Sequence, residues 1–140
     1  MQLSTNAFGK KEILASGSRN KTLIGRIWSG RTRKERAEEY LGYLYEHGVL
    51  PLEKKPGMLG VQLFRRFRGD VAEFTVISYW SSMKAMEAMH PGGGDVRRVA
   101  HLEKDPEYLL ELPEFVELTE LHANDWELEG QPPGSVRDSG

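Results

Sequence analysis

Two alternating segments joined by a glycine turn constrain the fold of this chain more than any other feature. The first runs from 59 to 67, the second from 72 to 80, and Arg68-Gly69-Asp70 lies between them. Alternation of apolar and polar residues is typical of strands, and a short glycine turn between two such segments is typical of a hairpin. The sequence therefore predicts an antiparallel pair of strands around which the rest must pack.

A further strand is predicted ahead of the hairpin over 23–29, a short β-branched and aromatic segment that ends at Gly30. Its residues alternate between two faces. One face carries small and aliphatic residues: Leu23, Gly25 and Ile27. The other is apolar with one charge: Ile24, Arg26 and Trp28.

A helix is predicted between this strand and the hairpin. Thr32 and Glu35 have the spacing of a capping box, and an apolar stripe follows, so we expect a helix over 33–47. Gly48 suits the end of a helix, and Pro51 is expected to prevent its continuation.

After the hairpin the sequence predicts a helix, a loop and a last strand. A pair of serines can cap a helix over 83–89, and three glycines at 92–94 end it. A short helix is expected over 105–110, where an Asp-Pro pair begins it. Residues 115–122 alternate and predict the final strand.

The predicted order is strand, helix, strand, strand, helix, strand, which is that of the ferredoxin-like α+β fold. We expect one such domain over 22–123, with an antiparallel sheet and the helices on one face. Residues 1–21 are expected to form a flexible tail or an edge strand near 12–15, and residues 124–140 a disordered tail.

Composition excludes several classes of protein. The absence of cysteine removes disulfides, thiolate nucleophiles and cysteine-ligated metals, and the four histidines are too scattered to predict a metal site. A net charge of -2 argues against nucleic-acid binding. No apolar run is long enough to span a bilayer, and the start of the sequence lacks a signal peptide, so we expect a cytoplasmic protein without membrane contact.

The predicted fold leaves one sheet face without helices. On that face we place a mixed apolar and polar set: Ile24, Arg26, Trp28, Gln62, Phe64, Thr75, Ile77 and Tyr79. Trp80 is placed with Phe74 and Val76 in the core beneath the helices. A face this apolar favours burial against a second copy, so we expect a homodimer with a cavity between sheet and partner.

Several motifs occur in order over 23–122: Ile24-Gly25-Arg26-Ile27-Trp28, Pro56-Gly57, Tyr79-Trp80-Ser81-Ser82 with Ala85, and Phe115-Val116-Glu117. With them the chain resembles the antibiotic biosynthesis monooxygenase family of dimeric α/β-barrel proteins. The resemblance implies a ferredoxin-like subunit, a homodimer and a pocket in each subunit. The family includes cofactor-free monooxygenases that act on polycyclic phenols, and haem-degrading enzymes.

The chain departs from the haem-degrading branch. That branch uses an asparagine on the first strand, a tryptophan late in the second helix and a histidine beyond it. Here residues 23–30 hold no asparagine, Met89 stands near the tryptophan position, and His90 or His101 matches the histidine only loosely. Haem binding or degradation therefore remains a minor alternative, and a solvated helix-end residue is the favoured interpretation of His90.

Cofactor-free oxygenation needs a group that removes a proton and a cation that stabilises the resulting anion. Arg26 is the candidate cation, with an ion pair to Glu73 or Glu117 as its alternative role. His101 is the candidate base, because a histidine titrates near neutral pH.

The candidate ligand-binding residues are aromatic side chains and one further histidine: Trp28, Phe64, Tyr79 and His90. Trp28 and Tyr79 can stack on a planar substrate or pack an interface. Two functions stay open. One is a cofactor-independent oxygenase acting on a small hydrophobic or aromatic molecule, with no metal; the other is a non-catalytic dimeric small-molecule-binding or stress-response module.

Overall fold

The computed structural model describes residues 22–125. The tail predicted at 1–21, its edge strand and all but the first two residues of 124–140 lie outside this range. Four strands form one antiparallel sheet in the order β2-β3-β1-β4: β1 Leu23–Arg33, β2 Met58–Arg68, β3 Val71–Trp80 and β4 Glu117–Leu121. This is the strand order of the ferredoxin-like fold, and it confirms the predicted α+β class.

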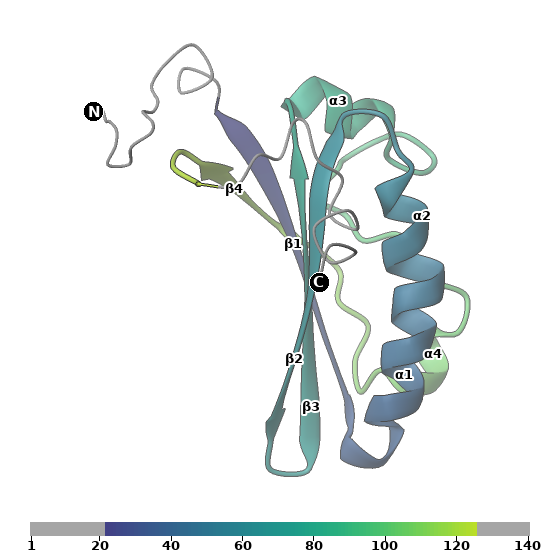
Figure 1. The fold of residues 1–140 in the computed structure, drawn as a ribbon. Coiled ribbons are helices and arrows are strands. Elements are labelled where there is room, and N and C mark those ends of the chain that lie inside the picture. Colours follow the sequence, from purple (N-terminus) through teal and green to yellow (C-terminus); the bar gives the residue numbers. More distant parts are fainter. Residues whose placement is uncertain (1–21, 126–140) are drawn as a thin grey trace.

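A continuous helical segment covers one face of the sheet (Figure 1). It consists of a 3-10 turn Lys34–Arg36, α1 Ala37–Leu44, a π-helical turn Tyr45–Val49 and α2 Leu50–Glu53. The helix was expected to end at 47, and that expectation is wrong. A proline has no N–H to donate to the preceding turn, but the first positions of a new helical segment need no such donor, and Pro51 occupies one of them in α2.

The beginning of this segment also differs from its prediction. Thr32 is fully buried in β1 opposite Ala72, and β1 continues four residues beyond the predicted strand end at 29. The residue that caps the 3-10 turn, Arg33, makes no side-chain capping hydrogen bond. The expected capping box therefore does not form, because pairing with β3 holds the threonine in the sheet.

The second crossover contains two short helices, α3 Met83–Ala88 and α4 Asp105–Tyr108. Ser82 caps α3, since its Oγ accepts a hydrogen bond from the Ala85 N–H at 3.0 Å. The three glycines at 92–94 have positive φ, but α3 already ends at Ala88 with Met89 as its C-cap, so the helix stops before the glycines that were expected to end it. Within residues 22–125, every helix is too short or too polar to traverse a bilayer.

The register of β1 against β3 corrects the predicted sheet faces. Ile24 lies opposite Trp80, Arg26 opposite Ser78 and Trp28 opposite Val76. Directly opposed residues of antiparallel strands point to the same side. Ile24, Arg26 and Trp28 therefore face the helices together with Trp80, not the open side where the sequence analysis placed them.

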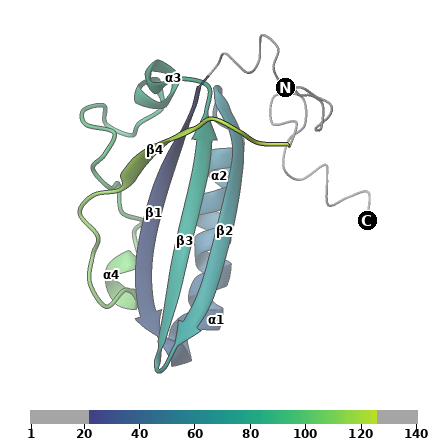
Figure 2. The same cartoon turned by 90° about the vertical axis from the view of Figure 1, so that its left-hand side faces the viewer.

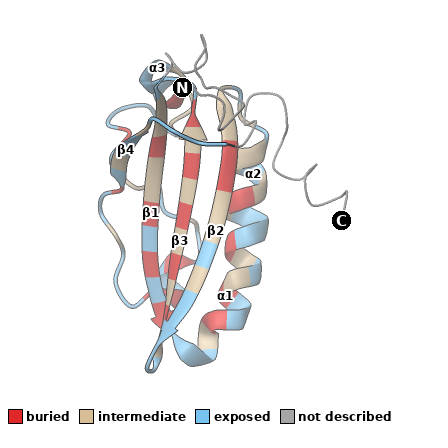
Figure 3. Ribbon diagram, turned by 60° about the vertical axis from the view of Figure 1, so that its left-hand side comes forward, coloured by how far each residue is buried: buried red, intermediate tan, exposed pale blue. Residues whose placement is uncertain are grey.

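The open face is nevertheless half apolar. Figure 2 looks onto it and shows the helices behind the sheet. On this face, Ile27 and Gly25 of β1 lie opposite Ile77 and Tyr79 of β3. Thr75 of β3 lies opposite Phe64 of β2. Leu23 and Ile27 thus take the places that Ile24 and Trp28 were expected to hold. Figure 3 shows the consequence along β3, where buried and half-buried residues alternate.

A fully buried tyrosine connects the helical layer to the second crossover. The Tyr40 ring packs edge-on against Phe74, with centroids 5.2 Å apart. Its hydroxyl donates to Asp105 Oδ1 at 2.9 Å, and Asp105 Oδ2 accepts the Leu102 N–H at 3.0 Å. These contacts fix the segment that contains α4 against α1.

We predict that Tyr40→Phe destabilises the fold by about 1–3 kcal/mol, because it leaves a buried carboxylate short of a donor. Chemical denaturation measures the change in the free energy of unfolding. Tyr45→Phe is the matched control, since Tyr45 is exposed on the same helical segment. Equal stability of Tyr40→Phe and wild type would contradict this role of the hydroxyl.

Candidate functional site

A pocket of about 270 Å³ lies between the sheet and its own helices. Its floor comes from β1 and β3, one wall from the helical segment 37–53, and the other from α3 and the loop that follows it. Most of its lining is apolar: Trp28, Leu44, Leu52, Val76, Trp80, Met86, Met89, Val99 and Leu102. Six polar or charged side chains also line it: Arg26, His47, Lys55, Ser78, His90 and Asp105.

Gly30 allows Trp28 to lie flat along the floor of this pocket. A Cβ on Gly30 would come within 2.6 Å of the Trp28 ring and within 3.2 Å of Leu109. Glycine is therefore needed inside β1 for this close approach, and it does not end the strand as the sequence suggested. The indole of Trp80 is oriented by a hydrogen bond from its Nε1 to Ser78 Oγ at 2.9 Å.

Arg26 brings a half-buried positive charge to the pocket. Its Nε donates to the Val96 carbonyl at 3.0 Å and its Nη2 to the Arg98 carbonyl at 3.3 Å. No carboxylate of residues 22–125 forms an ion pair with it, and burial lowers the pKa of the guanidinium. The ion pairs considered for Arg26, with Glu73 or Glu117, are absent because Arg26 faces the helices and those acids face the open side.

His90 follows α3 and lines the same pocket. Burial lowers the pKa of its imidazole below the ordinary value, and the positive charges of Arg26 and Lys55 lower it further, against a smaller opposite effect of Asp95. Lys55 lies next to it, since Lys55 Nζ donates to the Met89 carbonyl at 3.1 Å. His90 is therefore neutral near pH 7 and able to accept a proton.

The pocket is also lined by three residues that were not predicted site residues: His47, Lys55 and Asp105. His47 comes from the π-helical turn, and its ring lies 4.8 Å from that of Tyr43. Its side chain is 55% exposed, which places it at the rim. His47 lies at the end of the predicted helix, Lys55 follows α2 beyond that end, and Asp105 begins α4. These three positions are far apart in the chain, so no local sequence signal placed them in one pocket.

The structure divides the predicted site residues into three groups. Arg26, Trp28 and His90 line one pocket together. Phe64 and Tyr79 lie on the open face, where the Tyr79 hydroxyl donates to Gln62 Oε1 at 2.9 Å and burial raises the pKa of Tyr79. His101 is exposed and does not line the pocket, although its neighbours on both sides do.

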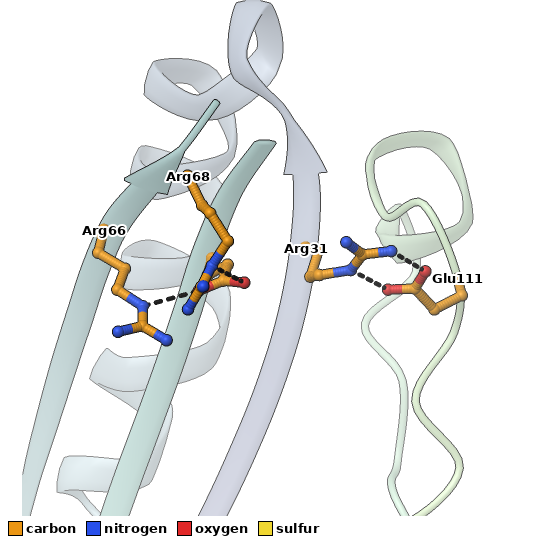
Figure 4. A network of polar contacts seen from close by, with 5 residues as sticks. Arg31, Arg66, Arg68 and Glu111 are labelled. Carbon is orange, nitrogen blue, oxygen red and sulfur yellow. Dashed lines mark hydrogen bonds and ion pairs between the residues drawn. The ribbon is translucent and has the colours of Figure 1, made fainter. Parts of the chain in front are cut away.

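A second hollow, of about 550 Å³, lies on the open face between β1 and β2. Its charged residues are already paired (Figure 4): Glu73 accepts hydrogen bonds from Arg66 at 2.7 Å and Arg68 at 3.2 Å. The hydrogen bond from Arg66 is the main cause of the lowered pKa of Glu73. Arg31 forms a two-pronged ion pair with Glu111. We therefore take the apolar pocket under the helices as the candidate site.

The described part of the chain holds no group of three or more His, Asp or Glu side chains placed to bind a metal ion.

Comparison with known proteins gives a likeness of fold. No family model matches the sequence, and no curated protein matches it. A presumed antibiotic biosynthesis monooxygenase from Bacillus cereus is 12% identical with a TM-score of 0.47, and the match covers 77% of this chain and 98% of that one. A protein of unknown function from Nitrosomonas europaea is 19% identical with a TM-score of 0.48, covering 76% and 94%. At these values the two likenesses carry no argument about family or function.

We predict that the pKa of His90 lies below 6.5 and rises when Arg26 is replaced by glutamine, because a nearby positive charge is removed. Titration of the imidazole resonances by NMR measures both values, with Arg66→Gln as the control. Since the folded chain binds this proton less readily than the unfolded chain, His90 also makes the fold less stable as the pH falls through 6.5. An unchanged His90 pKa in Arg26→Gln would show that the two groups do not interact.

Proposed function

We propose that this chain is an antibiotic-biosynthesis-monooxygenase-like protein whose pocket binds a small hydrophobic or aromatic molecule and oxygenates it without a cofactor. One observation carries the proposal. A half-buried guanidinium, which has no carboxylate partner among residues 22–125, lies near a histidine of lowered pKa in a pocket lined by two indoles. Small-molecule sites have this combination of apolar walls and a few convergent polar groups.

The pocket residues fit the steps of such a reaction. Trp28 and Trp80 contact a planar ligand, and His90 removes the proton of its phenol or enol. Arg26 stabilises the anion that results. The anion then reduces dioxygen: a ring CH₂ becomes a carbonyl with one oxygen atom, and the other leaves as water with the two hydrogens. His90 takes the role expected of His101, which lies outside the pocket.

The second candidate function is non-catalytic binding of a small molecule by the same pocket. Two N–H groups of Arg26 donate to the carbonyls of Val96 and Arg98, which gives the guanidinium a structural use independent of any reaction. A binding or stress-response module needs only apolar walls that contact the ligand and one polar side chain that hydrogen-bonds to it.

The open face supports the proposal of a homodimer. Its centre is apolar, where Ile27 lies opposite Ile77, and its rim carries the charges of Arg31, Arg66 and Glu73. An apolar centre with a polar rim is the usual anatomy of a protein interface. Tyr79 and Phe64 extend the apolar area, and Phe64 is 49% exposed in the single subunit.

For the reaction, we predict that the protein consumes oxygen with 1,8-dihydroxyanthrone, and that Arg26→Gln and His90→Gln each lower the rate about 100-fold. An oxygen electrode measures the rate, and His101→Gln is the control because it changes an exposed histidine outside the pocket. Binding without oxygen uptake would favour the second candidate, and the absence of both would refute the pocket function. A Soret shift on haem titration would instead support the haem alternative.

For the dimer, we predict that wild-type protein has the mass of two chains in light scattering and that Ile77→Asp has the mass of one. The charge would be buried without a partner at the centre of the open face. Tyr45→Asp, which adds the same charge to an exposed position on the helical segment, should stay dimeric. A monomeric wild type would remove the basis for the interface.

A further inference from the structure

We infer that the pocket holds its ligand as an anion: an acidic molecule with an apolar body, whose ionised carboxylate or phenolate group binds Arg26 and Lys55 beside His90. This inference rests on the proposed function, because it assigns a substrate class to the same pocket. It requires that no acid of residues 22–125 forms an ion pair with the positive charges of the lining, and that these charges lie near one another in the pocket.

The charges that line the pocket are unbalanced. Arg26 and Lys55 are cationic, whereas Asp105 is the one acid among the described residues that line the pocket. Asp105 is 2% exposed, and both of its oxygens are occupied, one by the Tyr40 hydroxyl and the other by the Leu102 N–H. It therefore neutralises neither cation by direct contact, and the apolar walls around them carry no charge.

The two cations keep unused hydrogen-bond donors. A guanidinium has five N–H donors, and Arg26 directs two of them to backbone carbonyls in the loop. An ammonium group has three, and Lys55 directs one to the Met89 carbonyl. These three hydrogen bonds to carbonyls leave the two positive charges uncompensated among residues 22–125, and a half-buried charge without a partner is costly. An anionic ligand removes that cost.

The positive charges of Arg26 and Lys55 both act on His90, so both lie near the same part of the pocket. His90 lies close enough to both for each to disfavour its protonation, and the Met89 carbonyl that binds Lys55 is adjacent to His90 in the chain. The methionines Met86 and Met89 and the two indoles line the remaining walls. A ligand that fits has one ionised end near Arg26 and Lys55 and an apolar body against Trp28 and Trp80.

A purely structural role of Arg26 makes a different prediction. If its guanidinium served only to hold the loop through Val96 and Arg98, replacing it would lower stability but would not change the preference between charged and neutral ligands. Lys55 separates these roles. Its ammonium group donates to the Met89 carbonyl at the end of α3, so its replacement leaves the hydrogen bonds of Arg26 to Val96 and Arg98 in place.

The test compares two probes of the same shape, 1-naphthoate and 1-naphthalenemethanol, by isothermal titration calorimetry on the full chain at pH 7. We expect wild type to bind the carboxylate at least about tenfold more tightly than the alcohol. Arg26→Gln should remove this preference while the alcohol still binds, and Lys55→Met should reduce it. Arg66→Gln, which changes an arginine outside the pocket, should leave both affinities unchanged.

The possible results of the titrations distinguish the anion preference from the proposed function of the pocket. Equal affinity for both probes, unaffected by Arg26→Gln, would overturn the anion preference and leave the proposed pocket intact. Failure of both probes to bind wild type would overturn both proposals. If Arg26→Gln does not fold, Arg26→Lys and Lys55→Met carry the test: a retained preference in the first and a reduced one in the second support the inference, and no change in Lys55→Met refutes it.

Discussion

The candidate site depends on how the loop after α3 is held against the rest of the subunit. Arg26 binds the loop from the sheet through the carbonyls of Val96 and Arg98, and Tyr40 binds it from α1 through Asp105. The Lys104 N–H adds a third attachment, since it donates to the Tyr43 hydroxyl at 2.8 Å. The segment needs such attachments to close the side of the pocket, because α3 and α4 are too short to form stable helices by themselves. The polar contacts that hold the loop in place therefore also form one side of the pocket.

The hydrogen bonds of Arg26 to the loop also explain why the site keeps a positive charge. A cation that donates to backbone carbonyls can hold a loop in place and keep its full positive charge. An ion pair with a carboxylate would neutralise that charge. Arg31 shows the contrast, since its guanidinium is neutralised by Glu111 on the surface. Over residues 22–125, the other arginines are paired with acids and Arg26 is not. This arrangement leaves the positive charge of Arg26 available to a ligand.

Local features were predictable from the sequence, and non-local register was not. The hairpin turn at Gly69 and the cap at Ser82 depend on neighbouring residues and agree with prediction. The side of β1 that faces the helices depends on its register with β3, and a shift of one residue reverses it. Arg26 and Trp28 were therefore chosen as functional residues, but on the wrong face. His90 and His101 could not be separated, because the loop between them has no periodicity.

The central claim is that a ligand binds beneath the chain's own helices and not on the open face of the sheet. The most direct test is to add 1-naphthoate to ¹⁵N-labelled protein and follow the indole and backbone resonances by NMR. The account predicts shifts at the indoles of Trp28 and Trp80 and at the amide of Ser78, with Phe64 and Thr75 unchanged. Shifts confined to Phe64 and Thr75 would place the ligand on the open face and contradict it.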